Sequence, residues 1–458
     1  MLEKSVDVGD VRIYSLFRED QAEGARYCLR AAEDIVKYYK DWLGFYPFEF
    51  LYILPGGSGV SGGYPMATGM VRIHGLQKFP TANALHWTWI TSHEIGHQYW
   101  GEYVLDDDNP QWLWIGMGVY ADREYTLARG YGAEKQISMM HRFIYALEKG
   151  YDTTIDVTTE ERRKLDFNYN SLIRHGKGFS FISALDITIG KDTFQRAYKR
   201  TLAEYGGKRL GWKDFQKLCE KESGENLNWF FDQWVRSDKY LYYRITDRRS
   251  CEKNGAWISE ITVKREGTLT MPIPVQAVFE DGTSQMKFTD RTKKTNVLIF
   301  ESKSRLWAEK IDPENKLPML TTQLPPPTGP AVELIKSLPP TGAGPNAYRV
   351  YRVALEQKLD HGEAWFDLGM CLFDGGYYKE AYYSFNKAVD SKPSNVYVFA
   401  SFAWMGMMQD LMGNHEQAIS HYQEALKTFE GNTMSHSQFG LEINKAWVEK
   451  LIKDPFKW

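Results

Sequence analysis

The stretch Thr91-Ser92-His93-Glu94-Ile95-Gly96-His97-Gln98-Tyr99-Trp100-Gly101 contains the motif H-E-x-x-H. On a helix, positions i and i+4 project from one face, so His93 and His97 can hold one cation together. Glu94, one step around the helix, can then reach a water molecule on that cation. This arrangement is typical of zinc hydrolases. It predicts zinc as the cofactor, His93 and His97 as metal ligands, and Glu94 as a catalytic residue.

The residues around the motif favour a helix. The run 82–100 has no internal proline, Thr81 or Asn83 can cap its start, and Gly101 is suited to end it. However, H-E-x-x-H also arises by chance in a chain with 10 histidines, so the motif alone does not establish a metal site. The interpretation therefore depends on the rest of the chain.

Length and composition limit the possible classes of protein. The chain of 458 residues is long enough for about three to four domains, and its hydrophobic content of 43% is typical of a well-packed protein. A net charge of -3 gives no electrostatic reason to expect nucleic acid or an anionic membrane as a partner, and neither is predicted. The four cysteines lack C-x-x-C spacing, so we expect neither a disulfide framework nor a cysteine metal site.

No stretch of the sequence is apolar for the roughly 18 residues that a membrane span requires. The first residues, MLEKSVDVGDVRIY, lack the apolar core of a signal peptide. We therefore expect a soluble chain without a membrane span. Sequence alone leaves the compartment unknown, although the cytoplasm is favoured unless a targeting segment has been removed.

Apolar spacing predicts the elements on both sides of the motif. We expect strands over residues 11–17, 48–54 and 70–74, the last at a sheet edge, and helices over residues 21–43 and 112–129. The glycine-rich run 56–63 lacks the Gly-Lys-Ser/Thr ending of a phosphate loop and is interpreted as a turn. Further helices are expected as far as Val235.

After Leu241 the apolar period changes from helical to two. Short strands are predicted over residues 256–264, 274–279, 286–288, 297–300 and 306–311, which together indicate a small antiparallel sandwich. Two proline-rich runs, 325–327 and 339–340, then flank a short helix. This segment is interpreted as a semi-rigid linker.

The C-terminal part of the chain is an internal repeat. The tetratricopeptide pattern of small and large residues is matched by Trp365, Leu368, Gly369, Leu372, Ala381, Phe385, Ala388 and Pro393. Half-repeats precede it at Ala347, Tyr351 and Ala354, and follow it at Gly406, Gly413, Ala418, Tyr422 and Ala425. Residues 438–452 are expected to form a capping helix. The repeats predict either a surface for a protein partner or a structural appendage.

The chain resembles the gluzincin aminopeptidase family that includes aminopeptidase N. The resemblance runs from about Tyr14 to Asp312. Its motifs occur in the family's order: Tyr46-Pro47, His93-Glu94-x-x-His97-Gln98-x-x-Gly101, Trp114-Ile115-x-x-Gly118, Gly176-Lys177-Gly178 and Ile311-Asp312-Pro313. This resemblance implies zinc and a thermolysin-like catalytic domain followed by a β-sandwich. It does not extend to most of the family's large N-terminal β-domain.

Three positions differ from the family pattern. The family's third zinc ligand, a glutamate, aligns with Met117, whose thioether binds zinc poorly. The family's catalytic tyrosine aligns with His175. The motif Gly-x-Met-Glu-Asn, whose glutamate anchors the substrate's free amino group, corresponds to the run 62–67, which has no acid. The candidate substrate-binding residues in this run are Gly62, Gly63 and Tyr64.

His175 can compensate for these differences in two ways. It can donate a hydrogen bond to a developing oxyanion, or it can supply a third nitrogen to zinc in place of the missing carboxylate. Asp122 and Glu124 are weaker ligand candidates, and we interpret them as outward-facing charges or as partners of the ligands.

The predicted fold class is multidomain α+β, with four parts. These are a thermolysin-like metallopeptidase domain with a small N-terminal sheet (1–238), a β-sandwich (239–320), a linker with a short helix (321–345) and tetratricopeptide-like helices (346–458). The predicted function is a zinc-dependent metallopeptidase that hydrolyses peptide bonds in a peptide or protein substrate. The alternative is a catalytically inactive relative that serves as a peptide- or protein-binding scaffold.

Overall fold

The computed structural model describes residues 1–56, 62–74, 84–107, 112–131, 133–319, 329–338, 347, 351, 361–374, 376–393, 395–431, 434–436 and 441–457. Backbone contacts divide the chain into two compact units. One contains Met1–Gln98, Tyr125–Gly132 and Gln323–Trp458, and the other contains Tyr99–Glu124 and Ala133–Thr322. Several predicted features lie outside the described residues, namely the caps at Thr81 and Asn83, the loop 57–61, most of the linker 321–345, and Ala354.

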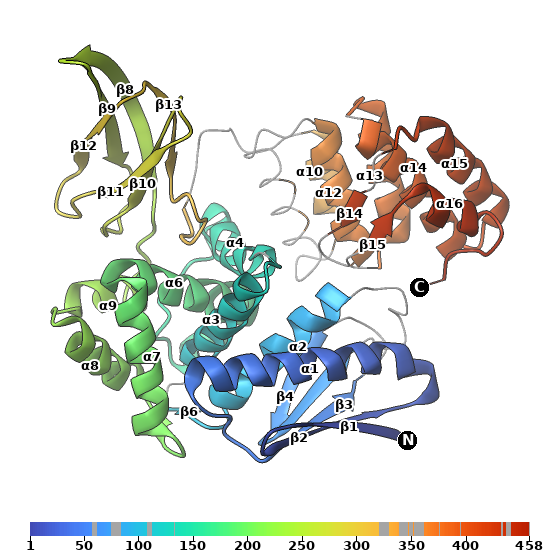
Figure 1. Ribbon diagram of the computed structural model, residues 1–458, viewed down its shortest axis with the longest axis horizontal. Coiled ribbons are helices and arrows are strands. Elements are labelled where there is room, and N and C mark those ends of the chain that lie inside the picture. The colour runs from blue at the N-terminus through green and yellow to red at the C-terminus, as the bar shows by residue number, and fades with distance from the viewer. Residues whose placement is uncertain are drawn as a thin grey trace. The chain divides into compact units, whose positions relative to one another are not determined.

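The N-terminal sheet has five strands in the order β1-β2-β3-β5-β4. Their bounds are β1 Leu2–Val8, β2 Val11–Phe17, β3 Phe50–Pro55, β4 Gly62–Ala67 and β5 Met70–His74. β3 is parallel to β2 and β5, and the other pairs are antiparallel. Helix α1 (Ala22–Leu43) lies along the sheet and ends at Gly44, whose φ of 92° is left-handed (Figure 1).

Two predictions for this sheet are wrong. β5 is an inner strand, because β4 pairs with its outer side and takes the edge position. Gly62 and Gly63 belong to β4 and not to a turn. The run 62–67 has no alternation of apolar and polar residues that would have predicted a strand. Its Pro65 is tolerated because an outermost strand does not need every backbone N–H for pairing.

The helix with the H-E-x-x-H motif is confirmed as α2 (Ala84–Tyr99), and the next helix as α3 (Trp112–Ala128). Gly101 follows α2 with a φ of 118°, as its predicted role at the helix end requires. The later helices are α4 Glu134–Lys149, α5 Thr159–Arg163, α6 Gly178–Ile189, α7 Lys191–Tyr205, α8 Trp212–Ser223 and α9 Asn228–Val235. A π-helical segment, η2 (Asn170–Lys177), leads directly into α6.

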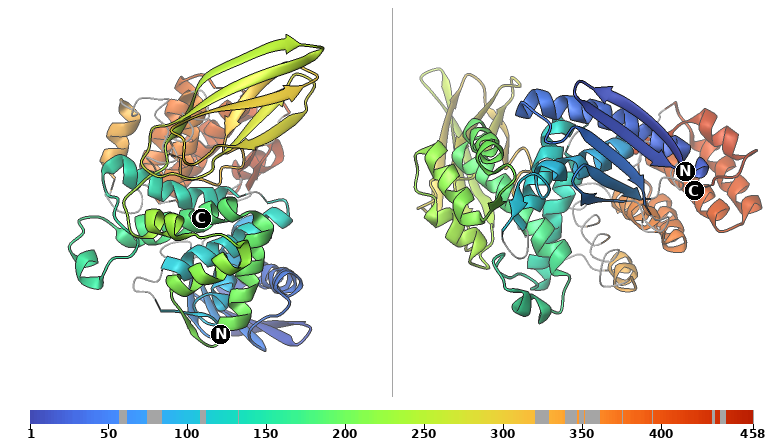
Figure 2. Two further views of the ribbon diagram at one scale, coloured as in Figure 1. Left: turned by 90° about the vertical axis from the view of Figure 1, so that its left-hand side faces the viewer. Right: turned by 90° about the horizontal axis from the view of Figure 1, so that it is seen from below.

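Six strands follow as two three-stranded antiparallel sheets, ordered β12-β9-β8 and β11-β10-β13. Their bounds are β8 Tyr243–Lys253, β9 Ala256–Arg265, β10 Pro274–Phe279, β11 Ser284–Phe288, β12 Thr295–Ser302 and β13 Leu306–Ile311. Figures 1 and 2 show these strands gathered in one body. β8 was not predicted, because most of its side chains are polar and exposed.

The C-terminal helices form hairpins. Their bounds are α10 Pro330–Lys336, α12 His361–Asp374, α13 Tyr378–Asp390, α14 Asn395–Leu411, α15 His415–Thr428 and α16 Lys445–Leu451. A side chain at Gly369 would meet the ring of Phe385 at 2.6 Å, and one at Gly406 would meet the ring of Tyr422 at 2.4 Å. The same small–large contact therefore closes both hairpins, as the repeat pattern predicts.

The predicted capping helix is partly wrong. Leu441–Ile443 forms a short strand, β15, which pairs with β14 (Met434–His436), and the helix begins only at Lys445. Asn444 sets this start, because its side chain accepts a 2.9 Å hydrogen bond from the backbone N–H of Trp447. Residues 438–440 lie outside the described part of the chain. No described helix is long and apolar enough to cross a membrane.

Candidate active site

Helix α2 brings the H-E-x-x-H side chains together. The exposed fractions are 7% for His93, 2% for Glu94 and 3% for His97. The two imidazole centroids are 4.8 Å apart with ring planes at 82°, and the ring of Trp89 stacks on His93 at 6.2 Å. Two imidazoles and a carboxylate are therefore held close together on one helix.

Strand β4 approaches Glu94 very closely. A Cβ atom at Gly63 would lie 2.4 Å from both Cγ and Oε1 of Glu94, so only glycine fits at this position without a shift. Gln98, one residue after the second histidine, holds the turn that follows β4. Its Oε1 accepts a 2.7 Å hydrogen bond from the N–H of Gly69, and its Nε2 donates to the carbonyl of Ala67 at 3.4 Å. The structure thus places the predicted residues Gly62 and Gly63 on the strand beside Glu94; the Tyr64 side chain lies outside the described part.

Helix α1 supports the back of α2. The hydroxyl of Tyr39 donates a 3.3 Å hydrogen bond to the carbonyl of Ser92. Cys28 lies against Thr91, and burial raises the pKa of its thiol to about 12. This cysteine is therefore an uncharged packing group.

The segment η2 holds His175. The Nδ1 atom of this histidine lies 2.6 Å from the carbonyl oxygen of Asn170, so Nδ1 carries the proton and donates. Lys177, two residues later, is fully buried and donates to Asp152 Oδ1 at 2.9 Å and to the carbonyls of Thr153 and Ser237. Burial lowers the pKa of Lys177. The lysine of the Gly-Lys-Gly motif is thus an anchor for η2.

Glycines allow the helices around η2 to approach one another. A Cβ atom at Gly176 would lie 2.7 Å from the backbone nitrogen of Phe143 on α4. One at Gly116, on α3, would lie 2.8 Å from the carbonyl oxygen of Gly178. Met117, next to Gly116, is completely buried, and its carbonyl accepts a 3.2 Å hydrogen bond from Tyr198.

Asp122 and Glu124 do not face outward. Their exposed fractions are 1% and 6%. Gln136 donates a hydrogen bond to Asp122, while Glu124 accepts one from Gln195 at 3.2 Å and pairs with Lys191 at 2.8 Å. The sequence interpretation of these residues as outward charges is therefore wrong, because both carboxylates take part in buried polar contacts.

The imidazoles of His93 and His97 meet some of the requirements of a zinc site. Neutral imidazoles are common zinc ligands, so His93 and His97 fit this metal by chemistry and spacing. Within the described ranges, no group of three or more His, Cys, Asp or Glu side chains is placed to hold a metal ion. Zinc sites nearly always use at least three protein donors. The two histidines alone would therefore not complete a zinc site, and a further donor would be needed.

Comparison with known proteins agrees with this geometry. Residues 76–234 match the peptidase family M1 domain, and residues 362–395 match a tetratricopeptide repeat. The M1 match includes α2, α3 and η2, whereas strands β4 and β5 precede it.

Part of the chain is also similar to a curated protein. The chain is similar to the tricorn protease-interacting factor F2 of Thermoplasma volcanium, with 21% identity over 215 residues. The match covers 43% of this chain and 26% of that protein. The chain thus spans about a quarter of the length of this relative.

Sequence reasoning named three residues near the candidate site without predicting their supporting contacts. Gly63, Gln98 and Lys177 act through contacts with segments distant in the chain. The only available signal was their position next to the recognised motifs.

Proposed function

We propose that the chain is a zinc-dependent metallopeptidase of the gluzincin type. In this proposal, residues 1–238 form a thermolysin-like catalytic domain, residues 239–320 a β-sandwich and residues 346–458 tetratricopeptide-like repeats joined through the linker 321–345. The observation that carries the proposal is the buried set on α2, in which two imidazoles lie 4.8 Å apart next to Glu94. The M1 domain match supports it.

The roles follow from chemistry. His93 and His97 would hold zinc, which when bound supplies a Lewis acid that lowers the pKa of a water molecule. Glu94 would take a proton from this water and pass it to the leaving amine. The Glu94 carboxylate can adopt few orientations, because the backbone of Gly63 on β4 covers one side of it.

His175 is our candidate for the third zinc ligand. Because Nδ1 donates to the Asn170 carbonyl, the neutral ring has its lone pair on Nε2. A histidine that binds metal commonly donates its other ring N–H to a backbone carbonyl in this way. The alternative role, donation to an oxyanion, would need a second proton on the ring. The tautomer therefore favours ligation near neutral pH.

A zinc titration of three proteins tests this assignment. Ligation by His175 predicts a large loss of zinc affinity in His175→Ala. If Met117 leaves the site incomplete, Met117→Glu is expected to bind zinc more tightly, because it restores the carboxylate of the family. If neither change moves the affinity, the further donor is a different residue and the assignment is wrong.

The missing acid in β4 bears on substrate choice. The run Gly62–Ala67 contains no carboxylate to pair with a free amino terminus. We therefore propose that a peptide binds alongside β4, at Gly62, Gly63 and Tyr64, without an amino-terminal anchor. Cleavage of matched free and N-acetylated peptides tests this point. Comparable rates are expected, whereas a strict demand for the free amine would refute it.

Peptide cleavage by Glu94→Gln tests the function itself. Loss of the general base is expected to slow turnover by about 10²–10⁴-fold while zinc stays bound. Turnover at the wild-type rate would exclude the proposed role of Glu94. A wild-type chain that binds peptides saturably and never cleaves them would instead be the inactive scaffold, with the helical repeats as its contact surface for a protein partner.

A further inference from the structure

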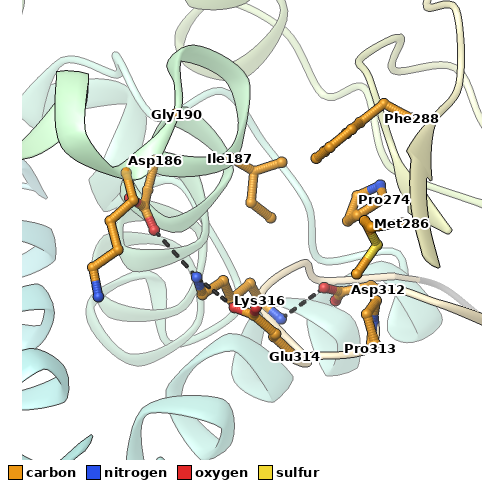
Figure 3. A pocket seen from close by; sticks show the side chains of 11 residues that line it. Asp186, Ile187, Gly190, Pro274, Met286, Phe288, Asp312, Pro313, Glu314 and Lys316 are labelled. Carbon is orange, nitrogen blue, oxygen red and sulfur yellow. Dashed lines mark hydrogen bonds and ion pairs between the residues drawn. The ribbon is translucent and has the colours of Figure 1, made fainter. Parts of the chain in front are cut away.

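A pocket lies between the α6–α7 junction and the sheet of β10, β11 and β13. Its volume is about 190 Å³ (Figure 3). One wall is apolar and is formed by Ile187, Pro274, Met286, Phe288 and Pro313. Met286 and Phe288 are 42% and 51% exposed, so both side chains are accessible to a ligand. None of these residues belongs to the proposed catalytic set.

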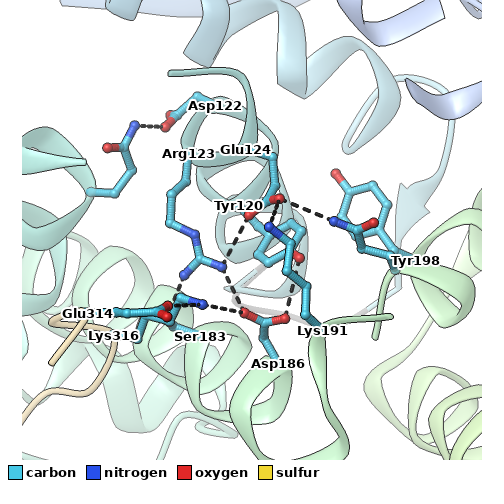
Figure 4. A network of polar contacts seen from close by, with 12 residues as sticks. Tyr120, Asp122, Arg123, Glu124, Ser183, Asp186, Lys191, Tyr198, Glu314 and Lys316 are labelled. Carbon is cyan, nitrogen blue, oxygen red and sulfur yellow. Dashed lines mark hydrogen bonds and ion pairs between the residues drawn. The ribbon is translucent and has the colours of Figure 1, made fainter. Parts of the chain in front are cut away.

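The other wall of the pocket is charged, and its cations already have partners. Lys316 Nζ lies 2.6 Å from Glu314 and 3.7 Å from Asp186. Asp186 also accepts a 3.0 Å hydrogen bond from Arg123 (Figure 4). Lys191 reaches away to Glu124 at 2.8 Å. Because each of these cations is matched by a carboxylate, the wall has little attraction for an anionic ligand.

Asp312 is the carboxylate in the wall without such a partner. It is 5% exposed, and its two oxygens accept backbone hydrogen bonds from Lys316 at 3.0 Å and Leu317 at 2.7 Å. In the described part of the chain, no cationic side chain lies within ion-pair distance of it. An ionised carboxylate can accept about four hydrogen bonds, so this one keeps capacity for a donor from the pocket side. Burial raises the pKa of Asp312 to about 6, and its backbone hydrogen bonds and the charge of Lys316 offset this effect only in part.

We propose that this pocket binds a small molecule with a protonated amine on an apolar group the size of one phenyl ring. The ammonium would lie against Asp312, and the apolar group against Met286 and Phe288. The volume is suitable, because a dry cavity of about 150 Å³ accepts benzene. The Phe288 ring offers a face against which a phenyl ring can stack. The site is separate from the proposed function and does not depend on it.

Calorimetric titration with three probes of similar shape tests the charge. The probes are 2-phenylethylamine, the neutral 2-phenylethanol and the anionic 3-phenylpropionate. At neutral pH the amine is expected to bind at least about tenfold more tightly than the other two, in line with a charged hydrogen bond. Equal affinity for the alcohol, tighter binding of the carboxylate, or no binding of the amine at millimolar concentration would overturn the proposal.

Two variants test the location. Asp312→Asn is expected to weaken amine binding at least about tenfold. Asp281→Asn, at an exposed turn of the same sheet, is the matched control and should leave it unchanged. Phe288→Ala removes a half-exposed ring, so it should fold and also weaken binding severalfold. Wild-type affinity in both Asp312→Asn and Phe288→Ala would show that the amine binds elsewhere and would contradict the proposal.

Discussion

Gly63 determines how closely strand β4 can approach Glu94. An added methyl group would lie 2.4 Å from the carboxylate side chain, so Gly63→Ala must displace either the strand or Glu94. Because general-base catalysis depends on the position of this carboxylate, we expect a loss of at least about tenfold in kcat/KM. Met66→Ala, which truncates a 39% exposed side chain of the same strand, is the control and should stay near the wild-type rate. Equal activity of Gly63→Ala and wild type would contradict this account of the contact.

Asp312 makes folding stability depend on pH. Its pKa is about 6 in the folded chain and 3.8 for an ordinary aspartate, so the folded chain holds a proton between these values that the unfolded chain releases. The stabilisation from this proton is complete below about pH 4 and is lost as the pH rises through about 6, with a total of about 3 kcal/mol. Asp312→Asn should lack this component. Urea unfolding of wild type and Asp312→Asn at pH 4 and pH 7 measures this component. If the unfolding free energies of the two proteins change with pH in parallel, the assignment to Asp312 is wrong.

At the scale of single residues, the sequence was informative where spacing within one helix is enough. His93, Glu94 and His97 were predicted together because their order is local. The contact of Gly63 with Glu94 depends on which strand occupies the sheet edge, and the pattern of the run Gly62–Ala67 did not predict a strand. The burial of Asp122 and Glu124 was also missed, because their partners lie on other helices.

At the scale of elements, η2 depends on Lys177. Its ammonium group is fully buried and donates three hydrogen bonds, one of them to Asp152. Lys177→Met would leave that carboxylate buried without its cation, so we expect a loss of about 3–5 kcal/mol in the free energy of unfolding. Lys164→Met removes a lysine that is 71% exposed and should cost less than about 1 kcal/mol. Chemical denaturation measures the free energy of unfolding of both variants. Equal losses in the two would contradict the anchoring role of Lys177.

Most elements could be predicted from apolar periodicity, and the exceptions share a physical cause. The helix α1 has a long periodic run of apolar residues, α2 and α3 are long runs without proline, and a glycine follows each of the three helices. The strands β1 and β8 were missed because their side chains are mostly polar and exposed, so backbone pairing and not burial defines them. The π-helical form of η2 could not be predicted, because eight residues are too few to distinguish its periodicity from that of an α-helix.

At the scale of the whole molecule, we expect that the C-terminal hairpins can be destabilised without loss of peptide cleavage. Gly406→Ala would bring a methyl group within 2.4 Å of the Tyr422 ring, and such overpacking typically costs about 1–3 kcal/mol. We expect lower thermal stability of the helical repeats and an unchanged rate of peptide cleavage. Met412→Ala, at a 37% exposed position, is the control. A fall in cleavage that matches the fall in stability would show that the repeats contribute to catalysis.

The central claim is that zinc on His93 and His97 makes this chain a peptidase. The most direct measurement is a titration of the metal-free chain with zinc, in which bound metal and the cleavage rate of an N-acetylated peptide are recorded in the same sample. The account predicts that cleavage rises in proportion to bound zinc and levels off at about one ion per chain, while Glu94→Gln binds the same zinc without comparable cleavage. Wild-type chain that is fully loaded with zinc and does not cleave, or metal-free chain that cleaves at the loaded rate, would contradict it.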